Sequence, residues 1–354
     1  MEIMKKPKLL YGVLDWGLGH ATRSLSIIRM FEKAGWDVEL AASGPAEELL
    51  KIHFPYLSIY TLPSYGIHYK YKPFWWGMVL QIPRIYRAIR AEKSFVEVLN
   101  GKNNYTLIVS DNRLGFRHPM VRSIYISHQL QLSLGVFSRL ATSAHAFFYR
   151  KFQSIWIPDS ADRALSGKLS LPPARLSSKC RFMGILSQFE QPLPPSKNGE
   201  VLFLLSGPEP ARTELEAILV KQAARLPQFR FHLVRGITDP YPLSLSSHIR
   251  VSTRLSGESL KEALSQSSCI VARSGYSTLM DLAVVRRPLI AIPTPGQGEQ
   301  EYLAAFHDKG GNVLRAHQRD IDLSTLLKNL PLKKFLPSVK PMGQDDLARL
   351  LERK

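Results

Sequence analysis

Cysteine is scarce in this sequence, which has two residues of it in 354, Cys180 and Cys269. Their separation matches none of the paired Cys and His spacings that bind zinc, and a disulfide scaffold would need more of them. Such scarcity is typical of proteins from a reducing compartment. The sequence therefore excludes a disulfide-rich secreted protein and predicts no metal site.

Long apolar runs are also missing. No segment reaches the roughly 18 consecutive apolar residues that a membrane-spanning helix needs. The N-terminal residues MEIMKKPKLL lead directly into a predicted strand and lack the apolar core and cleavage site of a signal peptide. We expect a cytoplasmic protein that can still sit on the inner face of a membrane.

Acidic residues are few, with 29 Asp and Glu against 47 Lys and Arg and a formal net charge of +18. Residues 1–185 carry 25 basic and 12 acidic residues, whereas residues 186–354 carry 22 and 17. A cationic first half predicts an anionic partner such as a membrane surface or a nucleic acid. The sequence contains no pattern of an RNA- or DNA-binding module, which disfavours the nucleic acid.

What the sequence does have is a regular alternation of short, nearly all-apolar segments with helix-like segments. That alternation is typical of α/β proteins with buried parallel strands. It runs twice, on either side of a Pro- and Ser-rich linker at 187–199. We predict two Rossmann-like domains, 1–186 and 200–332, facing across a cleft, followed by a tail, 333–354, whose helix can return to the first domain.

The second half repeats the alternation of strands and helices. Its predicted strands are VLFLLSG, FRFHLVRG, HIRVST, CIVARSG, PLIAIPT and NVLRA, and five helices are predicted to alternate with them. Ligands of such sheets bind in the loops that follow the strands. The predicted helices lie near 211–225, 258–267, 276–286, 299–310 and 321–330.

The first strand ends in an unusual glycine turn, LLYGVLDWGLGHATRS. A dinucleotide fingerprint would need a third glycine and an acidic residue at the end of the second strand, and both are missing. The turn of Gly17 and Gly19 instead presents His20 at the start of a helix, where it could take a proton from a substrate hydroxyl or bind an anion. The alternative is that His20 only caps the helix.

Two later strands of the first half end in polar residues at the same sheet edge. Asp111 ends one of them and could act as a base or orient one, or else form a salt bridge with Arg113 or Arg117. His128 and Gln129 end the next strand. These residues do not have the spacing of metal ligands. We predict that they meet His20 at one site.

In the second half, two strand ends are typical of phosphate-binding corners. The first strand runs into Ser206 and Gly207 before a helix, whose free backbone N–H groups suit an anion. A later strand ends at Arg273, Ser274 and Gly275, again before a helix. An ordinary β/α corner is the alternative reading of each.

The segment after Gly275 carries the polar residues expected around a nucleotide sugar. Asp281 lies about two turns into the helix, where its two carboxylate oxygens could accept both ribose hydroxyls. Gln300 and Glu301 begin the helix after the Pro- and Gly-rich loop 294–298 and could bind sugar hydroxyls. This segment is the most specific signal in the chain.

With the two-domain plan, these motifs resemble those of the GT-B glycosyltransferases, and within them the MurG-like family of lipid I N-acetylglucosaminyltransferases. The family's Gly-His loop is matched by Gly17 to His20, its His-Glu-Gln-Asn run partly by His128 and Gln129. The donor motif of the family falls, with matching spacing, on Arg273, Ser274, Gly275, Asp281, Gln300 and Glu301.

The departures from the family pattern concern single residues. Asp281 stands where the family has a ribose-binding Glu, and Glu301 where it has a second Gln. The first loop also has fewer glycines than the family form. The resemblance implies a nucleotide-sugar donor, whose leaving diphosphate is held by helix N-termini and Arg273 rather than by a metal, and it makes His20 or Asp111 the general base. It does not carry over the sugar or the lipid I acceptor.

Residues 65–93 combine aromatic and basic side chains. Such a surface suits the headgroup layer of an anionic membrane, although a helix with buried aromatics and solvated cations is the alternative. Single-stranded nucleic acid is a weaker reading. The segment contains Tyr65, Tyr69, Tyr71, Phe74, Trp75, Trp76 and Tyr86 among Lys70, Lys72, Arg84, Arg87, Arg90 and Lys93.

Together these observations predict a glycosyltransferase that needs no cofactor. It would move a hexose or N-acetylhexosamine from a UDP-type donor, bound by the second domain, to the hydroxyl of a lipid-linked or glycan acceptor, bound by the first. Two alternatives remain open: a UDP-sugar 2-epimerase or hydrolase on the same fold, and a non-catalytic binder of anionic surfaces. The oligomeric state is not predicted.

Overall fold

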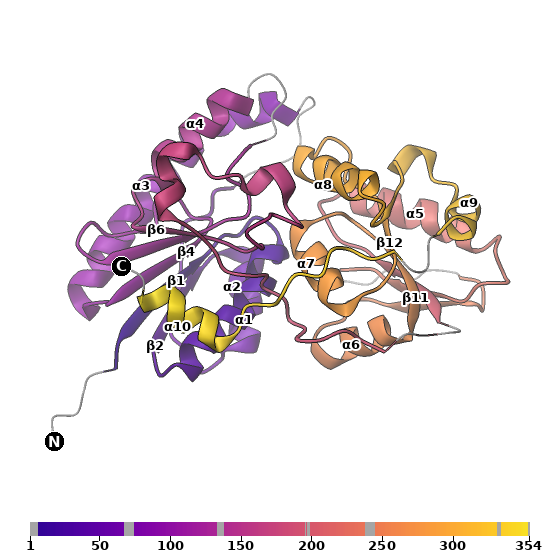
Figure 1. The fold of residues 1–354 in the computed structure, drawn as a ribbon, viewed down its shortest axis with the longest axis horizontal. Coiled ribbons are helices and arrows are strands. Elements are labelled where there is room, and N and C mark those ends of the chain that lie inside the picture. The colour runs from indigo at the N-terminus through magenta and orange to yellow at the C-terminus, as the bar shows by residue number, and fades with distance from the viewer. Residues whose placement is uncertain are drawn as a thin grey trace. The chain divides into compact units, whose positions relative to one another are not determined.

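The computed structural model describes residues 6–66, 74–132, 138–194, 196, 199–237, 245–330 and 334–352, and only the backbone of 74–80. The chain forms two compact units. Unit 1 comprises Met1–Gln188 together with Lys340–Lys354, and unit 2 comprises Phe189–Val339. Each unit has a parallel sheet of its own with helices packed on it (Figure 1).

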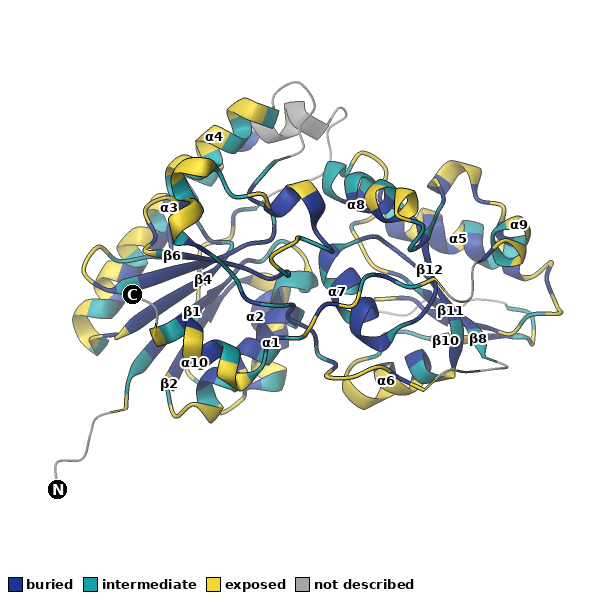
Figure 2. Cartoon of the chain, in the orientation of Figure 1, coloured by how far each residue is buried: buried dark blue, intermediate teal, exposed yellow. Residues whose placement is uncertain are grey.

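The sheet of unit 1 has the strand order β3-β2-β1-β4-β5-β6-β7, and every pairing in it is parallel. Its central strands are buried, as strands covered on both faces must be (Figure 2). The chain order reverses between β1 and β4, which is where open α/β sheets bind ligands. The strands are β1 (Lys8–Val13), β2 (Asp37–Ala42), β3 (Ile59–Thr61), β4 (Leu107–Asp111), β5 (Arg122–Ile126), β6 (Ser154–Ile157) and β7 (Cys180–Phe182).

The helices of unit 1 follow from apolar faces that pack on this sheet. In α1, for example, Ile27, Ile28 and Phe31 are fully buried. Its N-cap Gly17 has φ +76°, a left-handed conformation that favours glycine. The helices are α1 (Leu18–Lys33), α2 (Gly44–His53), α3 (Phe74–Asn103), α4 (Ser138–Tyr149) and α10 (Gln344–Glu352), with short 3₁₀ turns η2 (Gly167–Ser170) and η3 (Ala174–Lys179).

The C-terminal helix α10 belongs to unit 1. The guanidinium of Arg122 on β5 donates to the backbone oxygens of Leu350 and Leu351, at 3.2 and 2.5 Å. The segment before α10, residues 340–343, which we call the strap, also bonds to unit 1. The Ile185 N–H donates to the Lys340 oxygen at 3.2 Å, and the Met342 N–H donates to the Ile185 oxygen at 2.9 Å. Residues 340–352 are therefore part of the first unit.

Unit 2 has the strand order β10-β9-β8-β11-β12-β13, again with parallel pairing throughout. Its strands are β8 (Glu200–Leu204), β9 (Phe231–Val234), β10 (Ile249–Ser252), β11 (Ser267–Ala272), β12 (Leu289–Ala291) and β13 (Leu314–Arg315). Its helices are α5 (Ala211–Ala223), α6 (Gly257–Gln266), α7 (Tyr276–Val285), α8 (Gly298–Lys309) and α9 (Leu323–Lys328), with the 3₁₀ turn η4 (Gln318–Asp320).

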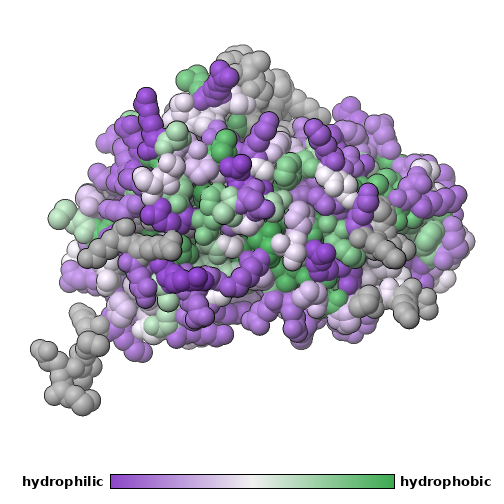
Figure 3. Space-filling view, viewed as in Figure 1, coloured by the Kyte–Doolittle hydropathy of each residue, from purple (hydrophilic) through white to green (hydrophobic). Residues whose placement is uncertain are grey.

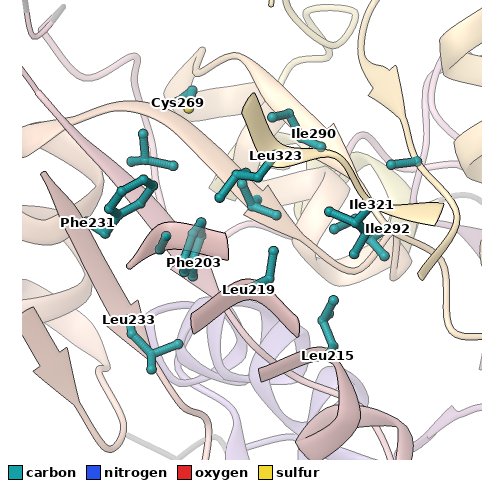
Figure 4. Close-up of a cluster of buried hydrophobic side chains, with 14 of the residues drawn as sticks. Phe203, Leu215, Leu219, Phe231, Leu233, Cys269, Ile290, Ile292, Ile321 and Leu323 are labelled. Carbon is teal, nitrogen blue, oxygen red and sulfur yellow. The ribbon is translucent and has the colours of Figure 1, made fainter. Parts of the chain in front are cut away.

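An apolar core between the sheet of unit 2 and helices α5 and α9 fixes these elements. Figure 4 shows Phe203 and Phe231 from neighbouring strands beside Leu219 of α5 and Leu323 of α9. The two phenylalanine rings lie 5.2 Å apart. Because all strands run the same way, the loops after β8, β11 and β12 lie at one edge of the sheet. The expected α/β fold with two Rossmann-like units is confirmed.

Candidate active site

In unit 1, the ends of β1 and β4 bring His20 and Asp111 into direct contact. The Nδ1 atom of His20 lies 2.8 Å from Oδ1 of Asp111. Asp111 is fully buried, whereas the side chain of His20 keeps 13% of its surface exposed. The predicted meeting of these two residues is thus present in the geometry.

Asp111 is enclosed by donors. Arg23, one turn after His20 on α1, donates to both carboxylate oxygens, and Ser24 donates to Oδ2 at 3.0 Å. These charges and hydrogen bonds hold the pKa of Asp111 well below its ordinary value, despite the opposing effect of burial. The alternative interpretation, a salt bridge of Asp111 with Arg113 or Arg117, is wrong, because the carboxylate pairs with Arg23 instead.

The environment of His20 fixes its charge and its tautomer. Burial, and after it the Arg23 guanidinium, lower the pKa of His20, so the ring is neutral at pH 7. Arg23 Nη2 also lies 2.8 Å from Nδ1 but donates to Asp111. We assign the proton of His20 to Nδ1, because the carboxylate oxygen of Asp111 can only accept, and Nε2 then keeps its lone pair. Within the described residues Nε2 has no hydrogen-bond partner, so it is available to a ligand.

The other expected residues of this edge lie around Arg23. His128 is nearly buried and its Nδ1 lies 3.1 Å from Nη1 of Arg23. Gln129 is half-buried, and its backbone N–H donates to Ser127 Oγ at 3.1 Å. Gly17 is the N-cap of α1 and Gly19 lies in its first turn. The structure thus brings His20, Asp111 and His128 together around one arginine.

Arg113, which the sequence offered only as a partner for Asp111, organises the loops beneath the site. It is fully buried, and its Nη1 donates to Glu92 of α3 at 2.8 Å. It also donates to the Val13 oxygen, at the end of β1, and to Ser43 Oγ, at the end of β2, each at 2.6 Å. Arg113 therefore holds α3 against the loop that carries His20.

In unit 2, the corner after β8 covers two buried polar atoms without partners. Gly207 has φ +108°, which strains any other residue. A Cβ placed there would lie 3.5 Å from Thr294 Oγ1 and 3.9 Å from Arg273 Nε. Neither of these two atoms has a hydrogen-bond partner, although both residues are more than nine-tenths buried. Buried donors left open at one spot indicate a ligand position.

Arg273 has one nitrogen left for such a ligand. Its Nη1 donates to the oxygens of Ile292 and Pro293, and its Nη2 to the Ala211 oxygen and to Gln318. Burial lowers the pKa of Arg273 to about 10, which leaves the side chain charged at neutral pH. The guanidinium therefore supports the loops after β11 and β12 and offers its Nε toward Gly207. Sequence reasoning missed Thr294, which has no motif signal of its own.

The other residues predicted to bind the nucleotide sugar lie at the same edge of the sheet. Ser206 is exposed, whereas Ser274 is buried and donates to the Gln300 backbone oxygen at 2.8 Å. Gly275 is the N-cap of α7. A Cβ placed on Gly275 would lie 3.8 Å from the Nε2 of Gln300. Asp281 is half-buried on α7.

Gln300 and Glu301 shape the loop after β12. The side-chain oxygen of Gln300 accepts from the Thr294 N–H at 2.8 Å, and Glu301 accepts from the Gly296 N–H at 2.8 Å. Within the described residues the Nε2 of Gln300 has no partner, so this amide can donate to a ligand. Glu301 instead uses one of its oxygens to hold the loop.

The aromatic and basic segment 65–93 is described only in part. Lys70, Tyr69, Tyr71 and Lys72 lie outside the described residues, and for Phe74, Trp75 and Trp76 only the helical backbone is described. Tyr65 is buried and donates to Glu92 at 2.9 Å, which contradicts a surface role for its ring. Ile82 and Tyr86 are exposed on α3.

The described residues form neither a membrane-spanning helix nor a metal-binding cluster. None of the helices there is both long enough and apolar enough to cross a bilayer. No cluster of His, Cys, Asp and Glu suited to a metal ion occurs among the described side chains.

Part of the sequence is similar to known glycosyltransferases. Residues 257–337 match the Glycosyltransferase family 28 C-terminal domain. Over 201 residues, the chain is 28% identical to a UDP-N-acetylglucosamine--N-acetylmuramyl-(pentapeptide) pyrophosphoryl-undecaprenol N-acetylglucosamine transferase of Methylobacterium radiotolerans. This match covers 53% of the chain, and it spans about half, 54%, of that relative.

Solved structures resemble the whole chain. The glycotransferase of kitacinnamycin superposes with a TM-score of 0.71 at 15% identity, covering 99% of both chains. MurG of Acinetobacter baumannii superposes with a TM-score of 0.61 at 14% identity, again covering 99% of both. The chain therefore has the GT-B glycosyltransferase fold, and its resemblance to the MurG-like transferases is confirmed.

Proposed function

We propose that this protein is a glycosyltransferase that moves a sugar from a UDP-type donor to an acceptor hydroxyl. The observation that carries the proposal is the neutral His20, whose Nδ1 is bound by a buried carboxylate and whose Nε2 is open. Such a histidine can take the proton of an attacking hydroxyl. The sequence match of residues 257–337 to a glycosyltransferase domain supports the same reaction class.

His20 is the general base of this proposal, and Asp111 is its positioning residue. Both oxygens of Asp111 already accept hydrogen bonds, and its low pKa makes the carboxylate a weak base. It orients the imidazole and stabilises the imidazolium that forms when Nε2 takes the proton. The acceptor hydroxyl would lie against Nε2, at the carboxyl ends of β1 and β4.

The donor would bind at the strand ends of unit 2. Its diphosphate would lie over Gly207, where Thr294 Oγ1 and Arg273 Nε are unpaired, with Ser206 and the N-terminus of α7 at Ser274 and Gly275 beside it. These donors would stabilise the charge that develops on the leaving diphosphate, without a metal or other cofactor. Asp281 would accept the ribose hydroxyls, and Gln300, with Glu301 shaping its loop, would bind the sugar.

Replacing Thr294 by valine tests the donor site, because the shape is kept and the hydroxyl is lost. UDP affinity, measured by calorimetry, should fall about fivefold to tenfold, the equivalent of about 1 kcal/mol. A panel of nucleoside diphosphates should show a preference for UDP that Asp281→Ala removes. Ser268→Ala is the control, since that hydroxyl lies at the opposite, amino-terminal edge of β11. Unchanged UDP binding by Thr294→Val would refute the placement.

Incubation with UDP-sugars separates the proposal from its two alternatives. An epimerase or hydrolase would release an epimer or free sugar without any acceptor, whereas a transferase would leave the donor largely intact. A non-catalytic binder of anionic surfaces would show no uridine-dependent stabilisation at all.

We also propose that unit 1 rests on an anionic membrane, which would present a lipid-linked acceptor; this keeps the protein at the inner face of the membrane. A patch formed by Lys93, Arg117, Phe147, Arg150 and Lys151 supports the contact, and we call it the Phe147 patch. Phe147 is 46% exposed, with Arg150 and Lys151 over its ring at 4.5 and 4.8 Å. Burial and the neighbouring cations Arg117, Arg150 and Lys93 lower the pKa of Lys151.

The Phe147 patch adjoins the acceptor loop. Phe148 packs, with Ile85 of α3 and Trp16 of the glycine turn, against a core of Leu14, Tyr65, Ala88 and Ile89. On the face drawn in Figure 3, hydrophilic residues predominate and hydrophobic ones are scattered among them. We assign the contact to cations with a few aromatic anchors rather than to a broad apolar surface, because the Phe147 patch places four cations around one exposed ring.

Vesicle binding tests the membrane proposal. Co-sedimentation with phosphatidylglycerol-containing vesicles should exceed that with pure phosphatidylcholine. Lys151→Ala and Arg150→Ala should each weaken it about fivefold, the equivalent of about 1 kcal/mol per cation. Arg225→Ala, an exposed cation on unit 2, is the control. Equal binding by all variants would contradict the Phe147 patch as the contact.

A further inference from the structure

The loop after β6 in unit 1 holds an arginine whose conformation and surroundings have no role in the reaction described above. Arg163 has φ +60°, in the left-handed region that is uncommon for residues other than glycine, asparagine and aspartate. Its side chain is half-buried, and its Nε is buried without a hydrogen-bond partner. Within the described part of the chain, no carboxylate or carbonyl accepts from its guanidinium.

The loop that carries Arg163 is rigidly built. The carboxylate of Asp159 is fully buried and accepts from the N–H groups of Ser160 at 2.7 Å, Leu165 at 3.3 Å and Ser166 at 2.7 Å. The nearest acidic residue in sequence, Asp162, accepts from Ser160 Oγ at 2.5 Å and forms no salt bridge with Arg163. The loop is therefore held by its own hydrogen bonds, and no described carboxylate pairs with the Arg163 guanidinium.

This loop borders the candidate acceptor site. The N–H groups of Leu130 and Gln131 both donate to the Leu169 oxygen at 2.8 Å, which ties the segment after His128 to the Arg163 loop. Across the sheet, Asp111 pairs with Ile126 and Ile126 with Trp156. Neighbouring strands lie about 4.8 Å apart, so β6 is about 10 Å from β4 at this edge.

We propose that Arg163 is an oxyanion-binding residue of the acceptor site, and that it takes a phosphate or carboxylate group of the acceptor. A guanidinium presents Nε–H and Nη–H side by side in a fork that matches two oxygens of either group. An oxyanion there would satisfy the buried Nε–H and supply the missing negative charge. The inference rests on the proposed function for the identity of the acceptor, but the anion site itself does not.

Direct binding to the full chain tests the site without any turnover. The chain is labelled with ¹⁵N-arginine and saturated with UDP, so that unit 2 is occupied, and pyrophosphate or malonate is then added. The Nε–H signal of Arg163, identified by its loss in Arg163→Lys, should shift with one of the two anions. Pyrophosphate alone would assign a phosphate, and malonate alone a carboxylate.

Substitutions supply the second readout, by calorimetry with the same anions. Arg163→Asn removes the charge with a residue that tolerates the left-handed conformation, and it should weaken binding about tenfold to a hundredfold. Arg163→Lys should restore part of it, and Arg175→Asn, an exposed arginine on η3, should change nothing. An Nε–H signal that neither anion moves, with Arg163→Asn binding like the wild type, would overturn the proposal. A chain that binds anions at Arg163 but transfers no sugar would refute the proposed function alone.

Discussion

Replacing His20 by glutamine is expected to lower kcat by about 10² to 10⁴, the range that a general base contributes, while UDP binding stays unchanged. Glutamine keeps a polar side chain on α1 but cannot take a proton from the acceptor. The measurement is steady-state transfer with a UDP-sugar, with kcat and the two KM values separated. His317→Gln, an exposed histidine of unit 2, serves as the control. A His20→Gln enzyme with nearly full kcat would exclude the histidine as base.

The companion substitution Asp111→Asn distinguishes a positioning role from a catalytic one. It should lower kcat as well, because an amide no longer fixes the Nδ1–H tautomer of His20. Unlike His20→Gln, it should also lower the melting temperature, since the buried Arg23 would lose the carboxylate that it now pairs with.

The pH profile of the wild type gives an independent check on the base. Burial and Arg23 lower the pKa of His20 from its ordinary value of 6.5, so the ring stays neutral, and the base active, down to a lower pH. The acid limb of kcat/KM should therefore lie below pH 6.5 and should disappear in His20→Gln.

Replacing Glu92 by glutamine should destabilise unit 1 by about 3–5 kcal/mol, the cost of leaving a buried cation unpaired. Glu92 and Arg113 are both fully buried and 2.8 Å apart, and the other oxygen of Glu92 accepts from Tyr65 and from the Gly115 N–H. Glutamine can keep part of these hydrogen bonds but not the charge. Asp15, 3.8 Å from Arg113, compensates only in part.

Urea unfolding measures this effect on unit 1 alone. All five tryptophans of the chain lie between Trp16 and Trp156, so their fluorescence reports on unit 1 and not on unit 2. Glu97→Gln is the matched control, because Glu97 lies on the same helix but is half exposed and should cost less than about 1 kcal/mol. If Glu92→Gln unfolds like Glu97→Gln, the buried pair does not stabilise the unit.

The fold was predictable because parallel strands buried on both faces leave an all-apolar signature. β4, for example, is buried at every position, and the second half yielded helices within a few residues of their observed bounds. The bounds of shorter elements were predicted less well. Of the predicted strand NVLRA only Leu314–Arg315 pair with β12, and the helix predicted at 321–330 is confined to Leu323–Lys328. The strand β7, Cys180–Phe182, has no signature of its own and depends on its pairing with β6.

The candidate site was predictable in its location but not in its contacts. Strand ends of one parallel sheet must meet at one edge, which is why His20, Asp111 and His128 could be grouped from the sequence. The partner of Asp111, however, is Arg23, 88 residues away in the chain. The signal for Arg23 was its spacing of three from His20, which puts both on one face of a helix. Nothing in the sequence marked Thr294 or Arg163, whose unpaired atoms are visible only in three dimensions.

The return of residues 340–352 to unit 1 has a consequence for synthesis. Unit 2 is an insertion within unit 1, so a nascent chain can complete its second unit while the first still lacks α10 and the strap beside Ile185. The surface of unit 1 that α10 covers stays open to chaperones until residues 340–352 have been synthesised and have docked. Completion of the first unit is thereby coupled to synthesis of the second.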